Sequence, residues 1–183
     1  EINGTPFWLD KWNSALLYTS TYKVLAPKVK LNLYTNDVYY INKDGQTLSV
    51  KEGQIKRIIF FKGEDTSFVL GNFVFMKNPD DNSFHFHQVL VNGKADLFKL
   101  NTVFVKKSDY DPLSGKSNFN YVPKSAYYLS YNGSMQLLKL LNKESIFAIL
   151  KPGAVADDWL AKNKNKLRTE TDIIQFLYYF NNQ

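Results

Sequence analysis

The two histidines of the chain, His85 and His87, are the side chains best suited to metal binding or acid–base chemistry. Residues i and i+2 of a strand point to the same face, so both imidazoles could bind one metal ion. The third ligand would have to be a carboxylate, because the chain contains no cysteine. Two histidines on the wetter face of a hairpin are more often plain surface residues, and we favour that interpretation. A metal-dependent hydrolase that uses His85 and His87 is kept as a third hypothesis.

Two other short patterns resemble ligand-binding loops but lack residues that those loops need. The Gly-Lys-Ser sequence of residues 115–117 is similar to the end of a phosphate-binding loop, yet the glycine required five residues before Gly115 is Tyr110. Asp109, Asp111 and Ser114 have a spacing similar to that of a calcium loop, but the required glycine and glutamate are out of register. We interpret residues 108–117 as an exposed loop and expect no cofactor.

Composition excludes several classes of function. The absence of cysteine removes thiol nucleophiles, disulfide frameworks and cysteine-ligated metal sites. The net charge of +6 is spread along the chain, whereas nucleic-acid binding normally needs a clustered basic stripe. The densest basic stretch, residues 162–168, is interpreted as a solvated connector between two helices. We therefore predict a protein that is not an enzyme and does not bind nucleic acid.

Tyrosine pairs are the remaining feature that could serve binding. Neighbouring residues of a strand face opposite sides of the sheet, so one ring of each pair is expected to face solvent or a groove. An exposed tyrosine offers a flat apolar surface together with a hydroxyl. The candidate ligand-binding or partner-binding residues are Tyr39, Tyr40, Tyr127 and Tyr128. Core packing explains most such rings equally well.

Segments rich in Tyr, Phe, Val, Ile and Leu alternate with turn residues over the first three-quarters of the chain. Val29, Leu31 and Leu33 show the period-two pattern of a strand with one buried face. Several segments are joined by Asn-Gly or Asp-Gly pairs, which are typical of tight hairpins. We predict strands over residues 14–24, 29–34, 38–41, 47–50, 55–61, 67–76, 84–91, 95–106, 126–131 and 135–141. Pro27 is expected to end the first strand or to lie in the turn after it.

The pattern changes to helical spacing after residue 142. Residues 144–150 and 154–162 are predicted helices, separated by Pro152 and Gly153. Thr169 and Asp172 predict the capped start of a third helix, because both side chains can accept hydrogen bonds from free backbone N–H groups.

Strands that come first and helices that come last predict an α+β fold. We expect a large, curved antiparallel sheet, with a partly open barrel as the alternative, and C-terminal helices packed on it. The sheet body would span residues 1–142 and the helical segment residues 143–183, in a single domain. The longest apolar runs are too short for a transmembrane segment.

Four segments make the chain similar to a known group of proteins: the Asn-Gly-Thr-Pro-Phe element of residues 3–7, the aromatic strand of residues 30–40, residues 88–98, and the helical tail of residues 146–181. In these segments it resembles the uncharacterised exported proteins of Bacteroidetes-type bacteria, although Lys94 begins a looser spacing than is usual there. The resemblance implies a sheet-plus-helix body and export to the periplasm or cell surface after removal of a signal peptide. It implies no activity. A chain that starts at Glu1 fits a removed signal peptide and equally fits a cloning boundary.

Three functional hypotheses follow. The leading one is a non-enzymatic cell-envelope protein that binds another macromolecule, such as an envelope protein. The alternative is a protein that binds a small apolar ligand in a cavity between the sheet and the helices. A single core filled by Phe60, Phe75, Phe104 and Trp159 would leave no room for that cavity. The third hypothesis is the metal-dependent hydrolase.

Overall fold

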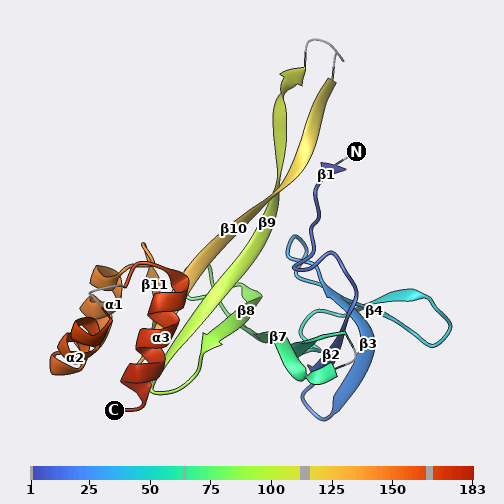
Figure 1. Ribbon diagram of the computed structural model, residues 1–183. Helices are drawn as coiled ribbons and strands as arrows, with labels where there is room; N and C mark the ends of the chain where they lie inside the picture. The colour runs from blue at the N-terminus through green and yellow to red at the C-terminus, as the bar shows by residue number, and fades with distance from the viewer. Residues whose placement is uncertain (1, 64, 112–115, 164–166) are drawn as a thin grey trace. The chain divides into compact units, whose positions relative to one another are not determined.

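The computed structural model describes residues 2–63, 65–111, 116–163 and 167–183, without the side chains of residues 108–111 and 116–117. The described residues form strands followed by three helices, which confirms the predicted α+β fold (Figure 1). The strands are β1 (Ile2–Asn3), β2 (Asn13–Tyr18), β3 (Lys23–Leu31), β4 (Val38–Ile41), β5 (Thr47–Val50), β6 (Arg57–Lys62), β7 (Asp65–Lys77), β8 (Phe84–Val91), β9 (Ala95–Asp111), β10 (Lys116–Tyr131) and β11 (Ser134–Leu138). The helices are α1 (Lys143–Leu150), α2 (Ala154–Lys162) and α3 (Glu170–Asn181).

The strands belong to one mixed sheet. Their order is β1-β10-β9-β8-β7-β6-β2-β3-β4-β5, and β11 also pairs with β10. Over the described residues this order is open, because β1 and β5 end it without pairing with each other. The hairpin neighbours are antiparallel, as predicted, whereas β1 runs parallel to β10 with Ile2 opposite Phe119.

The chain divides into two compact units. Unit 1 consists of Glu1–Met76 and Asn101–Ser125, and unit 2 consists of Lys77–Leu100 and Ala126–Gln183. Phe60 is buried in unit 1, Trp159 is buried in unit 2, and Phe104 is 44% exposed, so these rings do not fill a single core. The organisation as one domain stays a prediction.

Residues 14–24, which were predicted as one strand, form parts of two strands. β2 ends at Tyr18, and a turn closed by a hydrogen bond from the Thr19 N–H to the Tyr22 carbonyl (2.9 Å) leads into β3. Pro27 lies inside β3, so its predicted place at or beyond a strand end is wrong. The β2–β3 register shifts beside Pro27, and a proline is tolerated at such an irregularity because no regular ladder bond is needed there.

The register shift keeps one face of unit 1 apolar. Ala26 pairs with Ala15, and Val29 pairs with Asn13. Asn13 and Ala15 are two residues apart and share a face, so Ala26 and Val29 share it too, although a regular strand would place them on opposite faces. The core of unit 1 lies on this face and includes Ala15, Leu17, Val29, Leu31, Val38, Ile58 and Phe60.

The helices of unit 2 pack against two hairpins, β8–β9 and β10–β11. The turn at Asn132 and Gly133 has φ values of 51° and 75°, as a tight hairpin requires, and it joins β10 to β11 as predicted. The Thr169 hydroxyl accepts from the Asp172 N–H and the Asp172 carboxylate accepts from the Thr169 N–H, which confirms the predicted cap. The unit 2 core contains Val91, Leu97, Leu129, Leu138, Ile146, Leu150, Trp159, Ile173, Phe176, Leu177 and Phe180.

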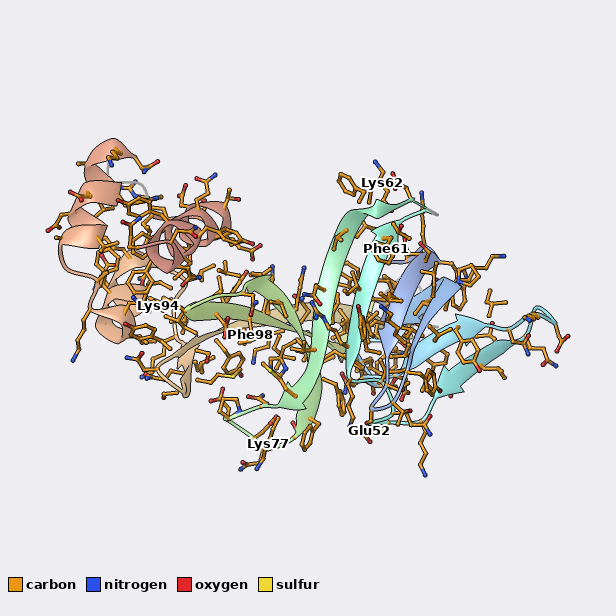
Figure 2. All side chains as sticks on the ribbon, turned by 90° about the horizontal axis from the view of Figure 1, so that it is seen from below. Glu52, Phe61, Lys62, Lys77, Lys94 and Phe98 are labelled. Carbon is orange, nitrogen blue, oxygen red and sulfur yellow. The ribbon has the colours of Figure 1, made fainter. Side chains whose placement is uncertain are left out.

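The end of α3 is fixed to the β8–β9 hairpin. The Asn181 amide donates to the Ala95 carbonyl (2.9 Å) and accepts from the Ala95 N–H (2.7 Å). Figure 2 labels Lys94 in this hairpin, and the Lys94 ammonium lies 5.2 Å from the centre of the Phe180 ring. These contacts hold the helical layer of unit 2 on its strands.

The predicted loop over residues 108–117 is wrong for the residues that the structure describes. Residues 108–111 continue β9, and residues 116–117 begin β10, so the two strands form a long ribbon (Figure 1). Among the described helices, none combines the length and the apolar character needed to span a membrane.

Candidate functional site

A cavity of about 690 Å³ lies on the apolar face of unit 1. Its apolar lining consists of Leu17, Val24, Ala26, Tyr40, Val50 and Ile55. These residues come from β2, β3, β4, β5 and the segment that leads into β6. The volume lies within the usual range of small-molecule sites, about 300–1,000 Å³.

Cross-strand pairing explains why these side chains gather. Leu17 pairs with Val24, and Val29, which shares their face, pairs with Tyr40. The register shift in β3 is needed for this arrangement, because without it Tyr40 would lie on the face opposite Val24. Val24 is 44% exposed although it is apolar and lies in a strand. Part of the apolar lining of the cavity is therefore in contact with water.

Polar residues complete the lining: Thr19, Tyr22, Lys23, Ser49, Lys51 and Gln54. The Thr19 hydroxyl accepts from the Tyr22 N–H (3.1 Å) and donates to the Tyr22 carbonyl (3.1 Å), which holds the β2–β3 turn. A hydrogen bond from the Gln54 N–H to the Lys51 carbonyl (3.2 Å) closes a second turn. Two ordered turns thus border an apolar floor.

A second, smaller cavity of about 360 Å³ also belongs to unit 1. The rings of Phe7, Trp8 and Tyr121 line it, with Asn101 and Lys124 among its polar residues. Trp8 also packs on the core rings Phe60 and Phe73, so much of its surface is already covered. The larger cavity is the better candidate for a ligand site.

The structure places only one of the four tyrosines selected from sequence at the larger cavity. Tyr40 lines it, whereas Tyr39 lies on the opposite face of β4 against Phe7, with ring centres 6.0 Å apart. Tyr127 and Tyr128 both belong to unit 2. Within unit 1, the rings of Tyr39 and Tyr40 therefore do not share one patch.

Tyr127 belongs to a polar cluster that ties α3 to the sheet of unit 2. Its hydroxyl and the Lys99 ammonium both donate to Oε2 of Glu170, the latter at 2.7 Å. Burial would raise the pKa of Glu170, but the hydrogen bonds from Lys99 and Tyr127 outweigh burial and lower that pKa. Burial, followed by the hydrogen bond to Glu170, raises the pKa of Tyr127. Each group has a structural partner, which explains the cluster without a ligand.

Tyr128 is a core residue rather than a surface residue. Its side chain is 2% exposed, and its hydroxyl donates to Oδ2 of Asp80 (2.9 Å). Burial, together with this hydrogen bond to a carboxylate, raises the pKa of Tyr128 to about 12. Tyr128 therefore remains a neutral hydrogen-bond donor at ordinary pH.

The two histidines have different surroundings. Nε2 of His85 lies 2.6 Å from the Ser83 hydroxyl, which itself donates to Asp81 (2.6 Å). His87 is fully buried, and its ring lies 5.7 Å from that of Tyr128. Among the described side chains, no group of three or more His, Cys, Asp or Glu residues is arranged to hold a metal ion.

The phosphate-loop-like motif includes Gly115, and the calcium-loop-like motif includes Ser114; both residues lie outside the described part of the chain. The same is true of the side chains of residues 109, 111, 116 and 117.

The hydrogen bonding of His87 fixes its tautomer. Nδ1 lies 3.1 Å from the His85 carbonyl, and because a carbonyl can only accept, Nδ1 must carry the proton. Nε2 is buried without a hydrogen-bond partner among the described residues. Protonation would bury a charge and an unpaired N–H, so burial lowers the pKa of His87 below its ordinary value of 6.5.

This buried imidazole predicts a loss of stability in mild acid. Below pH 6.5 the unfolded chain takes up a proton that the folded chain does not bind until its lower pKa is reached. The free energy of unfolding should therefore fall as the pH decreases from about 7.5 to 5, by at most about 1.4 kcal/mol per pH unit from this residue. Urea denaturation at several pH values measures the slope.

The His87→Leu variant should flatten that slope, because it has no imidazole to protonate. His85→Gln is the matched control, because it leaves the buried His87 imidazole in place, and it should keep the part of the slope that His87 contributes. The carboxylates with lowered pKa values, Asp65, Asp81 and Glu170, titrate in a more acidic range and do not account for a change near pH 6. An unchanged slope in His87→Leu would contradict the assignment.

In comparisons with protein-family models, curated proteins and solved structures, nothing matches this chain. The resemblance to exported bacterial proteins stays a prediction.

Proposed function

We propose that this protein is a non-enzymatic binding protein that holds a small, largely apolar molecule in the 690 Å³ cavity of unit 1. The observation that carries the proposal is the exposed apolar lining, above all Val24, in a concave site of ligand size. Apolar surface in contact with water is unfavourable, and a ligand that covers it gains that free energy on binding.

The chemistry of the lining supports binding rather than catalysis. Among the residues that the structure describes, the polar lining groups are hydroxyls, an amide and two lysines, without a carboxylate or an imidazole. General acid–base catalysis usually needs a paired donor and acceptor in contact with the substrate. The carboxylate and imidazole clusters described above lie in unit 2.

The test uses N-phenyl-1-naphthylamine, an uncharged probe whose fluorescence rises in apolar surroundings. We expect saturable binding to the wild-type protein. Ala26→Phe places a ring in the cavity and should weaken binding about tenfold or more, because the ring occupies the ligand volume.

Leu25→Phe is the matched control for this experiment. Leu25 neighbours Ala26 in β3 but lies on the opposite face of the sheet and is 54% exposed. It should bind the probe as the wild type does. Absence of saturable binding, or equal losses in the two variants while both remain folded by circular dichroism, would contradict the proposal.

A macromolecular partner in the cell envelope is the second candidate, and the opposite face of unit 1 favours it. Leu25, Leu16 and Ile59 form one cross-strand row there, and Leu25 is largely exposed. Arg57 lies in the adjacent row and donates to Asn72. If this row binds a partner, Leu25→Asp should lose a protein that the wild type recovers from envelope extract, whereas Ala26→Phe should retain it.

A further inference from the structure

We infer that the cavity of unit 1 selects an anionic amphiphile, a molecule with an apolar chain and one negatively charged headgroup. This inference rests on the proposed function and adds the charge of the ligand. It starts from the charged residues of the lining, which are Lys23 and Lys51. Since the described residues of the lining include no carboxylate, the site carries cations over an apolar floor.

Backbone hydrogen bonds connect the segments that carry the two lysines, and the strand register places Lys23 on the face of Leu25, so its side chain borders the cavity rather than facing its floor. Lys23 pairs with Tyr18 at the start of β3, and the Tyr18 carbonyl accepts from the Lys56 N–H (2.7 Å). Lys51 begins the turn that ends at Gln54, two residues before Lys56. Through these backbone hydrogen bonds, residues 54–56 link the start of β3, which carries Lys23, to the turn that begins at Lys51.

Neither lysine is neutralised within the described part of the chain. The ion pairs there involve Lys30, His85 and Lys99. Glu52 follows Lys51 directly but does not line the cavity. Both lysines are exposed, and the four-carbon stem of each is long enough to carry its ammonium to the hydrated rim.

The floor and the rim of the cavity would recognise different parts of the ligand. The floor formed by Leu17, Ala26 and Val50 suits an alkyl chain, whose burial is not directional. The rim attracts a negative headgroup and disfavours a positive one, and salt should weaken this preference because the charges are exposed. We expect a free amphiphile rather than a membrane surface, because the apolar surface is concave.

The experiment compares three ten-carbon competitors for the bound N-phenyl-1-naphthylamine, each below its micelle concentration: decanoate, 1-decanol and decyltrimethylammonium. Decanoate should displace the probe at a concentration about 3- to 10-fold lower than decanol, an effect that two exposed charge pairs together can supply. Decyltrimethylammonium should be the weakest competitor. Adding 0.5 M NaCl should reduce the difference between decanoate and decanol.

The Lys23→Gln/Lys51→Gln variant should lose the preference for decanoate over decanol, measured by displacement of the probe. Lys106→Gln/Lys139→Gln removes the same charge from exposed positions outside the cavity and should keep the preference. Equal displacement by decanoate and decanol, or a preference that survives in the Lys23/Lys51 variant, would overturn the inference while leaving the apolar site intact.

Failure of the probe itself to bind would instead reject the proposed function. Sedimentation with phosphatidylglycerol vesicles measures the competing possibility of a membrane surface. Co-sedimentation that disappears in the Lys23/Lys51 variant would assign these lysines to lipid headgroups and overturn the inference. We expect the protein to stay in the supernatant.

Discussion

Replacing Phe176 by alanine is expected to lower the free energy of unfolding by about 3–5 kcal/mol, the usual cost of removing a buried phenylalanine ring. The Phe176 side chain is completely buried in unit 2. Its ring centre lies 5.5 Å from those of Phe147 and Trp159 and 6.2 Å from that of Phe180. All three helices contribute to this aromatic cluster, so one substitution opens a cavity that weakens the packing of each.

Thermal and urea denaturation followed by circular dichroism measure this effect. A loss of this size corresponds to a decrease of roughly 6–20 °C in melting temperature for a chain of this length. Gln175→Ala is the matched control, because the neighbouring residue of α3 is exposed and alanine is a good helix former. A Phe176→Ala variant as stable as Gln175→Ala would mean that the helices do not share this core.

Local signals made the helices and the tight turns predictable. Thr169 and Asp172 cap α3 through atoms three residues apart, so their interaction depends little on the rest of the fold. The Asn132–Gly133 turn depends on two residues that tolerate positive φ. In both cases the sequence holds the complete set of interacting groups within a few positions.

The arrangement within β3 could not be predicted in this way. Pro27 is a strand breaker by local rules, and only the pairing of Ala26 with Ala15 and of Val29 with Asn13 makes room for it. The parallel pairing of Ile2 with Phe119 joins residues that are far apart in sequence. Register between distant segments is set by the packing of whole faces, which no short window of sequence contains.

Only part of the candidate site could be predicted from the sequence, for the same reason. Tyr40 was selected as an aromatic binding residue and does line the cavity. Val24, Ala26 and Ile55 were not selected, because single apolar residues in strands look like core residues. The sequence signal that could have indicated them is Pro27, because a proline within a strand marks an irregularity, and here the register shift beside it places residues of β3 and β4 on a shared face.

In unit 1 the largest predicted effect comes from adding one methyl group. Gly71→Ala should lower the free energy of unfolding by about 1–3 kcal/mol, the usual cost of overpacking a core. A Cβ atom at Gly71 would lie 2.5 Å from Cη2 and 2.9 Å from Cζ2 of Trp8, and 3.0 Å from Cε2 of Phe73. The Trp8 ring cannot move freely, because its centre lies 4.8 Å from that of Phe73 and 5.2 Å from that of Phe60. The φ angle of Gly71 is not positive, so the cost is steric.

A double-mutant cycle with Trp8→Leu isolates this contact. Leucine at position 8 removes the atoms that the new methyl group would meet, so Gly71→Ala should cost less in that background by about 1 kcal/mol or more. The tryptophan emission of Gly71→Ala should also shift to longer wavelength if the Trp8 ring moves toward water. Equal costs of Gly71→Ala in both backgrounds would show that Trp8 does not limit the space at Gly71. A reduced cost would show instead that the N-terminal segment carrying Trp8 is part of the unit 1 core, because only a ring held in place can oppose a single methyl group.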